Sequence, residues 1–522
     1  MTYYILVSGG VMSGLGKGIT TASLGCLLKS KGYSVTAIKI DPYLNYDAGT
    51  MRPTEHGEVW VTEDGGEIDQ DLGHYERFLN QSIPKEQNLT TGKVYGKVIE
   101  KERAGEYLGK TVEVIPHVTD EIKRRIREAA KKTGAEMVLV EVGGTVGEYQ
   151  NMIYFEAARQ MKLEGEKILF VHLGYLPIPS HLGEMKTKPT QTSIKELGNI
   201  GIQPDFIVGR AEQPLDDVRK EKIALFSNLK KEDVISNPDL ESIYELPMIF
   251  EQQNFSARIL EKFGLKPKKT DMEQWKKVVD MMKNARKKVR IGIVGKYFDT
   301  GAFKLTDSYV SVIEAVKHAA AWNSLKPDIV WIDSKDYEKD KERLNELKGM
   351  DGIIVPGGFG SSGVEGKILA IEFARKNNTP FLGLCYGLQL SVIEFARNVC
   401  GMSDANSTEI DPKTNYPVID ILPEQKQILK DGKYGATMRL GGQTVKVKEG
   451  TMAYRLYGKS EVVERFRHRY EVNPQYVEQL EQEGLVFSGT TPDKKIMQII
   501  EIPSHKFFLA TQFHPEFTSR FM

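Results

Sequence analysis

Short apolar runs bounded by glycine alternate along this chain with stretches of helical periodicity. In the first part of the chain the runs lie at residues 4–7, 34–40, 137–141, 168–173 and 206–208. A second series begins at 289–294 and continues through 328–332 and 352–355. Such alternation is typical of parallel strands whose sheet is covered by helices. The sequence therefore predicts an α/β protein with two doubly wound, mostly parallel sheets.

A change in composition separates the two series. A lysine-rich and proline-containing stretch follows residue 264, at 266–269. Beyond it, apolar residues recur at helical spacing, at Trp275, Val278, Val279 and Met282. This pattern predicts an amphipathic connecting helix. We expect one domain at 1–265, a linker at 266–288 and a second domain at 289–522, since 522 residues are enough for two full cores.

The bulk composition restricts the partners and the compartment. Lys plus Arg and Asp plus Glu both number 71, so net charge gives no reason to expect nucleic acid or an anionic membrane as a partner. No apolar stretch is long enough to span a bilayer. The three cysteines, Cys26, Cys385 and Cys400, form no disulfide framework, and the first residues indicate a strand instead of a signal peptide. We therefore expect a cytoplasmic protein.

A glycine-rich segment follows the first predicted strand directly. Residues 9–18 read Gly-Gly-Val-Met-Ser-Gly-Leu-Gly-Lys-Gly, and a helical rhythm comes next. Such a loop turns backbone N–H groups toward phosphate, and Lys17 adds a positive charge. The loop departs from the G-x-x-x-x-G-K-[ST] motif, because Val11 replaces the first glycine and Gly18 stands where the magnesium-binding hydroxyl should be. A metal ion must then be held by other residues.

Carboxylates are the natural oxygen ligands to replace that hydroxyl. Asp71 lies in a short acidic segment, and Glu141 ends a predicted strand, where side chains line the ligand crevice of a parallel sheet. We therefore predict that both bind Mg²⁺. Residues 186–191 carry two ammonium groups and two hydroxyls on what we expect to be a proline-stiffened loop, which taken alone is better explained as solvated.

Cys385 lies between glycines in the segment Gly-Leu-Cys-Tyr-Gly-Leu-Gln at 383–389. Residues 380–382 indicate the end of a strand and 388–397 have helical periodicity, so Cys385 falls on a sharp strand-to-helix turn. We expect the flanking glycines to permit this bend and the thiol to be exposed there. The nearby helix N-terminus favours the thiolate, which makes Cys385 a candidate nucleophile.

His514 and Glu516 complete the candidate nucleophilic site. In an extended segment side chains alternate faces, so these two point the same way and Pro515 points away. The imidazole can take the thiol proton and the carboxylate can orient the ring. Residues 353–360 add a buried strand that runs into a bare-backbone loop, whose N–H groups can stabilise an oxyanion. The alternative is a buried structural cysteine and an unrelated loop histidine.

The pattern G-x-C-x-G-x-Q with a distant H-P-E resembles the class I glutamine amidotransferases, which hydrolyse glutamine through a thioester and release ammonia. Further blocks, at 8–11, 39–43, 55–59, 71–78 and 143–147, resemble the CTP synthase family, and this resemblance covers essentially the entire chain. The resemblance implies that the first domain is a phosphate-loop-like synthase domain and the second a class I glutamine amidotransferase domain. It implies ATP-dependent amination of UTP to CTP, through phosphorylation at O4, in pyrimidine nucleotide biosynthesis.

The resemblance also assigns residues, one position at a time. Catalysis falls to Cys385, His514 and Glu516, and glutamine binding to Gly358, Tyr386, Gly387, Leu388, Gln389, Glu409 and Arg469. The positions that match ATP-binding residues are Gly14, Leu15, Gly16, Lys17, Gly18, Ile19, Asp71, Pro238, Asp239 and Leu240. Those that match UTP- or CTP-binding residues are Ser13, Glu148, Tyr149, Gln150, Lys186, Thr187, Lys188, Pro189, Thr190, Gln191 and Lys222. Asp71 and Glu141 match the magnesium carboxylates, and His56 and Val59 lie near the ammonia passage. Glu409 and Arg469 are the expected pair for an amino-acid zwitterion.

The family further implies Mg²⁺ as cofactor, ATP as co-substrate, GTP as activator, CTP as inhibitor and a homotetramer. The chain departs from the family at 148–150, where Glu-Tyr-Gln replaces the common Asp-Ile-Glu, and relatives usually continue beyond Met522. The first departure bears on CTP feedback and base discrimination more than on the chemistry.

Two rival functions remain open from the sequence. One is another glutamine-fed amidoligase, such as a cobyrinic acid amide synthase, which would not be expected to carry the 186–191 segment together with Lys222. The other is a nucleotide-switched scaffold or filament protein with a retired glutaminase. The intact Cys385, His514 and Glu516 argue against that second rival.

Overall fold

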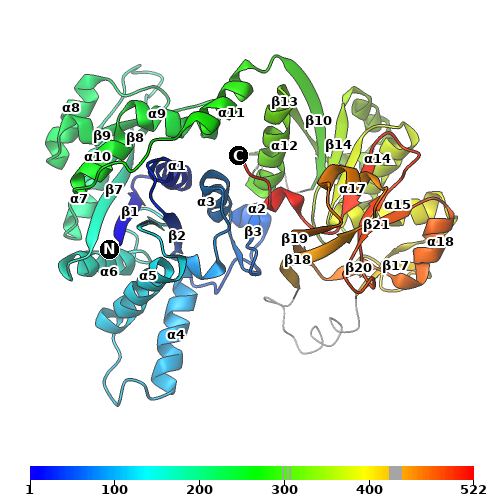
Figure 1. The fold of residues 1–522 in the computed structure, drawn as a ribbon, viewed down its shortest axis with the longest axis horizontal. Coiled ribbons are helices and arrows are strands. Elements are labelled where there is room, and N and C mark those ends of the chain that lie inside the picture. Colours follow the sequence, from blue (N-terminus) through cyan, green and yellow to red (C-terminus); the bar gives the residue numbers. More distant parts are fainter. Residues whose placement is uncertain (297–298, 301–302, 305–306, 422–437) are drawn as a thin grey trace. The chain divides into compact units, whose positions relative to one another are not determined.

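The chain folds into two compact units in a computed structural model that describes residues 1–296, 299–300, 303–304, 307–421 and 438–522 (Figure 1). Unit 1 consists of residues 1–48, 71–280 and 521–522, and unit 2 of residues 49–70 and 281–520. Residues 49–70 fall inside the first predicted domain, but they pack with unit 2. Among the described residues, no helix is both long and apolar enough to cross a membrane.

Unit 1 is built on a seven-stranded sheet in which every neighbouring pair is parallel. In spatial order its strands are β5 (Asn88–Thr90), β2 (Val35–Asp41), β6 (Met137–Val142), β1 (Tyr3–Gly9), β7 (Lys167–Tyr175), β8 (Phe206–Ala211) and β9 (Val234–Pro238). The five apolar runs predicted as strands correspond to β1, β2, β6, β7 and β8. The phosphate-loop candidate follows β1, in the middle of the sheet.

The helices of unit 1 accompany this sheet, and one continuous apolar core joins the sheet to the helices between residues 91 and 163. They include α1 (Lys17–Ser30), α3 (Asp71–Leu79), α4 (Thr91–Arg103), α5 (Thr119–Thr133), α6 (Met152–Leu163), α7 (Lys188–Asn199), α8 (Asp217–Ser227), α9 (Leu246–Gln252), α10 (Phe255–Lys262) and α11 (Glu273–Asn284). The last of these is the predicted connecting helix. Its Trp275 is buried, and the indole N–H donates to Tyr244 O at 2.9 Å. The amphipathic pattern therefore reflects packing against unit 1.

Unit 2 contains a nine-stranded sheet that is parallel in one half and antiparallel in the other. Its parallel strands are β13 (Leu325–Asp333), β10 (Lys287–Gly295), β14 (Gly352–Val355), β15 (Phe381–Leu384) and β23 (Phe508–Thr511). The antiparallel half continues through β22 (Met497–Glu501), β21 (Val486–Thr490), β18 (Arg439–Val447) and β19 (Glu461–His468). The predicted α/β class is confirmed, with a larger antiparallel share than the apolar runs indicate.

The helices of unit 2 cover its sheet around a second apolar core. They include α12 (Val310–Trp322), α13 (Ser334–Lys339), α14 (Val364–Lys376), α15 (Tyr386–Asn398), α17 (Met452–Tyr457) and α18 (Val477–Gln482). A small three-stranded sheet of β16 (Asn406–Ser407), β17 (Pro417–Ile421) and β20 (Tyr470–Val472) adjoins them. Leu388, Val392 and Ile393 on α15 are fully buried in this core. The helix that follows Cys385 is therefore rigidly anchored.

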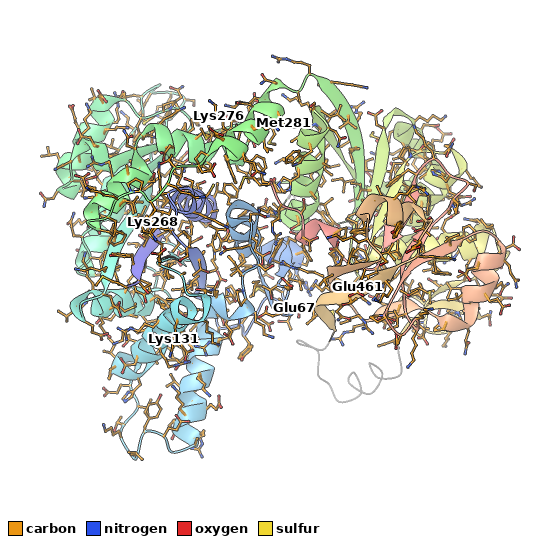
Figure 2. The ribbon with its side chains drawn as sticks, viewed as in Figure 1. Glu67, Lys131, Lys268, Lys276, Met281 and Glu461 are labelled. Carbon is orange, nitrogen blue, oxygen red and sulfur yellow. The ribbon has the colours of Figure 1, made fainter. Side chains whose placement is uncertain are left out.

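Residues 49–70, here named the strap, belong to unit 2 although they come from the first part of the sequence. The strap contains α2 (Pro53–His56) and the hairpin of β3 (Val59–Val61) and β4 (Glu67–Asp69). Arg465 donates to Val61 O at 3.0 Å, and the Arg467 guanidinium donates to Glu67 at 2.8 Å (Glu67 is labelled in Figure 2). The Glu67 side chain is 1% exposed. These long-range contacts explain why the strap packs away from its neighbours in the sequence.

Candidate active site

Cys385 lies on the predicted strand-to-helix turn, between β15 and α15. Its backbone has φ 51° and ψ −97°, a conformation that costs a non-glycine residue energy and is typical of functional turns. The flanking glycines are required because neighbouring atoms leave no room for a side chain, and not because of their backbone dihedral angles. A Cβ at Gly387 would lie 2.2 Å from Val355 O, and one at Gly383 would lie 2.8 Å from the Cβ of Ala510. The glycine prediction is confirmed, but the strained residue is Cys385 itself.

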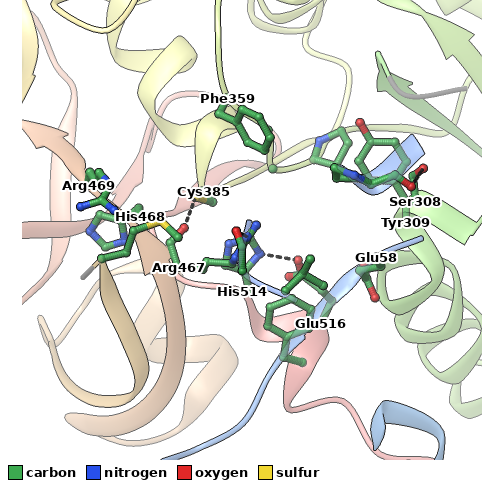
Figure 3. A pocket seen from close by; sticks show the side chains of 18 of the residues that line it. Glu58, Ser308, Tyr309, Phe359, Cys385, Arg467, His468, Arg469, His514 and Glu516 are labelled. Carbon is green, nitrogen blue, oxygen red and sulfur yellow. Dashed lines mark hydrogen bonds and ion pairs between the residues drawn. The ribbon is translucent and has the colours of Figure 1, made fainter. Parts of the chain in front are cut away.

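The thiol of Cys385 is buried, so the prediction of an exposed thiol is wrong. Cys385 is 5% exposed and lines a cavity of about 690 Å³. Its sulfur donates to Arg467 O at 3.6 Å and accepts from Gln512 Nε2 at 3.7 Å (Figure 3 shows the first contact). The ends of β19 and β23 supply these two residues and cover the turn. A substrate therefore reaches the sulfur through the cavity and not from open solvent.

His514 and Glu516 form the predicted imidazole–carboxylate pair. His514 Nδ1 lies 2.7 Å from Glu516 Oε1, and both side chains line the same cavity as Cys385 (Figure 3). The expected extended segment is wrong, since residues 515–517 form a 3-10 turn that still places both groups together. His514 Nε2 has no hydrogen-bond partner in the described part of the chain. The second ring nitrogen is thus available for proton transfer.

Electrostatics hold a proton on this imidazole. Burial opposes charge on the ring, but the Glu516 carboxylate and Cys385 outweigh it and raise the pKa of His514 to about 10. At neutral pH His514 is therefore an imidazolium. Such a group can donate its proton to a leaving amine.

The predicted bare-backbone loop follows β14 and lies against the catalytic residues. A Cβ at Gly357 would lie 3.0 Å from His514 Cε1, so only glycine fits this approach. Gly357, Gly358 and Phe359 line the cavity. Among the described residues, the Gly358 N–H has no hydrogen-bond partner. It is the natural candidate for an oxyanion donor in this loop.

Four of the predicted glutamine-binding residues line the cavity: Gly358, Gln389, Glu409 and Arg469. Tyr386, Gly387 and Leu388 do not line it, because they form the buried first turn of α15. Glu409 accepts from Gly360 N–H at 2.8 Å. Burial raises the pKa of Glu409, while this N–H and Lys296 act in the opposite direction. The cavity thus presents a carboxylate and a guanidinium beside a thiol, as an amino-acid amide requires.

Part of the cavity wall was not predicted as substrate-binding. The strap contributes its first five residues together with Glu58, and Arg467, His468 and Tyr470 also line the cavity. The charged run Arg-His-Arg-Tyr at 467–470 could have indicated the second group. Nothing in the strap itself signals its place. Of the two predicted passage residues, Val59 lines the cavity, whereas His56 pairs with Asp69 at 3.6 Å.

The predicted phosphate loop of unit 1 connects β1 to α1, which begins at Lys17. Gly14 and Gly16 have φ values of 75° and 83°, which glycine adopts without strain. Lys17 is buried and donates to Gly144 O at 2.8 Å, and burial lowers its pKa although Glu141 partly offsets the effect. A Cβ at Gly18 would lie 2.2 Å from Asp71 Oδ1. The missing hydroxyl is therefore replaced in space by the Asp71 carboxylate.

Asp71 and Glu141, the two carboxylates predicted to bind magnesium, both pair with the Lys39 ammonium. The Lys39 ammonium contacts Asp71 and lies 3.1 Å from Glu141. Burial raises the pKa of Glu141, whereas Lys39 outweighs burial and lowers the pKa of Asp71. No group of three or more His, Cys, Asp or Glu side chains able to hold a metal occurs in the described ranges. Two carboxylates fit a magnesium ion that takes its other ligands from phosphate and water.

The predicted pyrimidine segment 186–191 is a helix start and not a loop. Helix α7 begins at Lys188, and Pro189 is preorganised for the first turn. Thr187, Thr190 and Gln191 are buried, and the Thr190 hydroxyl donates to Tyr175 O at 2.8 Å. The hydroxyls therefore serve the fold, while Lys186 remains partly exposed beside Glu184. Only the ammonium groups and the helix N-terminus are left for phosphate.

The other predicted nucleotide positions lie around the same edge of the sheet. Ser13, Tyr149, Gln150 and Lys222 are exposed. Glu148 folds back onto its own loop, where it accepts from Thr145 N–H at 3.0 Å. Asp239 pairs with Arg210 at 2.5 Å just after Pro238, which ends β9. The Glu148 carboxylate therefore stabilises the loop. The nucleotide-binding roles of the remaining positions stay predictions.

The fold and the cysteine site define unit 2 as a glutamine amidotransferase. The family model described as glutamine amidotransferase class-I matches residues 304–522, and the one described as CTP synthase N-terminus matches residues 3–265. A CTP synthase from Pyrococcus abyssi is 56% identical over 523 residues, which is 100% of this chain and 95% of that protein. One from Sulfolobus acidocaldarius is 53% identical over 521 residues, which is 100% and 97%. The chain belongs to the CTP synthase family.

A solved structure is also similar to part of the chain. The glutaminase domain of Trypanosoma brucei CTPS with bound acivicin is 40% identical, with a TM-score of 0.41, and covers 45% of this chain and 88% of that one. The full-length relatives leave no support for the cobyrinic acid amide synthase alternative.

Proposed function

We propose that the protein is a glutamine-hydrolysing CTP synthase, which aminates UTP to CTP at the expense of ATP. One observation carries the proposal: the His514–Glu516 pair, 2.7 Å apart, shares a cavity with Cys385, Glu409 and Arg469. Relatives named CTP synthase align with the whole chain at 53–56% identity, and this similarity supports the nucleotide half of the proposed reaction.

Glutamine hydrolysis follows from the groups in the cavity. Glu409 binds the α-amino group of glutamine and Arg469 its carboxylate. The Cys385 sulfur attacks the side-chain carboxamide as a thiolate, its proton carried by His514, and the Gly358 N–H stabilises the oxyanion. The C–N bond breaks as His514 gives its proton to the leaving nitrogen, which departs as ammonia. Water then attacks the thioester, its proton passes to the now neutral His514, and the C–S bond breaks to give glutamate and the starting thiolate–imidazolium pair.

In the nucleotide reaction, the γ-phosphoryl group of ATP passes to O4 of UTP, which becomes a good leaving group. Ammonia attacks C4 and phosphate leaves. Lys17 binds the phosphates and stabilises their charge in the transition state. Asp71 and Glu141 would hold Mg²⁺, which neutralises phosphate charge when bound. Ammonia must reach C4 unprotonated, because ammonium has no lone pair for attack.

The finer assignments belong to the same proposal. Lys186, Lys188 and Lys222 would bind the pyrimidine nucleotide's phosphates, and residues 14–19 with 238–240 would bind ATP. GTP as activator, CTP as inhibitor and a cytoplasmic location rest on membership of the family. A homotetramer has further support in apolar side chains that are exposed around α4: Ile99, Leu108, Val114 and Ile115.

The test is CTP formation by the purified protein, followed by the absorbance change from uracil to cytosine. We expect Cys385→Ala to abolish turnover with glutamine and to retain turnover with ammonium at high pH, because only the nitrogen source is lost. Cys400→Ala is the matched control and should retain both. Equal loss with both nitrogen sources would contradict the division into two sites. Absence of CTP formation by the unaltered protein with either source would refute the proposed function.

A further inference from the structure

One lysine holds the glycine loop of the glutaminase site from outside the cavity. Lys296 directly follows β10 and is 7% exposed. Its ammonium donates to the carbonyl oxygens of Phe359 and Gly360, the second at 3.2 Å. Lys296 is absent from the side chains that line the cavity, so it does not touch the substrate. Any effect on glutamine must therefore pass through the loop.

The loop connects Lys296 to Glu409 through hydrogen bonds on the two sides of one peptide group. In a trans peptide the C=O and N–H groups of one plane point in opposite directions. Because Lys296 binds the C=O of Phe359, the N–H of the same plane, that of Gly360, points the other way. That N–H donates to Glu409 Oε1 at 2.8 Å. A single peptide plane thus connects the ammonium to the carboxylate that lines the cavity.

Further contacts fix the next peptide plane of the loop and the lysine itself. The Tyr386 hydroxyl donates to Gly360 O at 2.8 Å, and the Lys296 ammonium lies 5.5 Å from the centre of the same ring. Burial lowers the pKa of Lys296 to about 8, and the charge of Glu409 partly offsets this effect. The lysine and the carboxylate therefore influence each other through space as well as through the plane.

We propose that Lys296 is a positioning residue that orients Glu409 toward the α-amino group of glutamine and so sets the preference for substrates that carry this group. The inference rests on the proposed glutaminase function. It assigns Lys296 a part in substrate recognition and none in the bond-breaking step.

The test compares the hydrolysis of two amides, followed by the ammonia that each releases. One is glutamine, and the other is glutaramic acid, which is glutamine without its α-amino group. In Lys296→Met we expect kcat/KM for glutamine to fall at least 10-fold, mainly through KM, while kcat/KM for glutaramic acid changes less than 3-fold. The ratio of kcat/KM for glutamine to that for glutaramic acid should therefore fall. Alkylation of Cys385 by iodoacetamide and ammonia-dependent CTP formation should both be retained.

Lys367→Met is the matched control, since it removes another buried lysine near the same ring. Lys367 Nζ lies 5.6 Å from the Tyr386 centre, and it donates to Pro356 O at 3.5 Å, whereas Lys296 donates to Phe359 O and Gly360 O. It should keep the preference for glutamine. Lys296→Gln, which retains N–H donors, should give an intermediate preference and replaces Lys296→Met if that variant does not fold.

Two outcomes would overturn the inference: an unchanged preference in Lys296→Met, or an equal loss with both amides, which indicates general damage to the loop. Neither is confused with failure of the proposed function. That failure would appear as absence of glutamine hydrolysis in the unaltered protein.

Discussion

Replacing Glu516 by glutamine should shift the pH dependence of glutamine hydrolysis more than it changes the site's shape. Glutamine keeps an oxygen that can accept from His514 Nδ1, at the place where Glu516 Oε1 now lies at 2.7 Å. What it removes is the charge that does most to raise the pKa of His514 to about 10 against the effect of burial. The ring then returns toward the ordinary value of about 6.5 or below it.

The magnitude follows from the protonated fraction. At pH 8 an imidazole of pKa about 10 is roughly 99% protonated, and one of pKa about 6.5 is roughly 3% protonated. We therefore expect Glu516→Gln to lower kcat for glutamate release about 30-fold at pH 8 and only about 1.3-fold at pH 6, where a ring of pKa about 6.5 is still roughly 76% protonated. The loss of activity grows with pH because the variant's imidazole, with its lower pKa, is deprotonated at a lower pH than that of the unaltered protein.

The assay is glutamate release at saturating glutamine between pH 6 and 10. Glu478→Gln, an exposed position on α18, is the control for charge loss in the same unit. A loss by the same factor at every pH would refute this reasoning, since it would mean that Glu516 acts through geometry alone.

Three further predictions concern charge elsewhere in the molecule. Lys17→Ala should lower CTP formation at least 100-fold with glutamine and with ammonia alike, in the absorbance assay, and unchanged ammonia-dependent turnover would remove Lys17 from the mechanism. Burial lowers the pKa of Lys367 to about 7, so between about pH 7 and pH 10 the lysine takes up a proton when the protein unfolds. The free energy of unfolding, measured by urea denaturation, should therefore rise with pH in this range by roughly 1.4 kcal/mol per pH unit. Lys367→Met should abolish this rise. Glu67→Gln should destabilise unit 2 by about 3 kcal/mol by leaving the Arg467 charge without its buried partner, and an unchanged urea midpoint for loss of glutaminase activity would contradict this.

Much of the architecture could be predicted because it depends on local patterns. The predicted strands, which correspond to β1, β2, β6, β7, β8, β10, β13 and β14, are short apolar runs, and Cys385 follows such a run directly. The pairing of His514 with Glu516 was predicted for the wrong backbone conformation, yet it was confirmed, because residues two apart can also meet across a tight turn.

The features that were missed depend on contacts between distant parts of the chain. The thiol of Cys385 is buried by Arg467 and Gln512, which lie 82 and 127 residues further on. Residues 186–191 look like a polar loop in the sequence, but a helix begins at Lys188 and the Thr190 hydroxyl on it donates to Tyr175 O, at the end of β7. The role of Lys296 depends on two carbonyl groups in a loop more than sixty residues away, which no local motif reveals.

The strap has a consequence for anyone who would divide this enzyme at the junction between its two halves. A fragment that starts near residue 281 carries the whole cysteine machinery but lacks residues 49–53, 58 and 59, which line one side of the cavity, and Glu67, which neutralises Arg467. Such an excised piece would offer its sulfur to solvent and small electrophiles more freely than the intact chain does. The first part of the sequence thus supplies one wall of the cavity in which the second part places its cysteine.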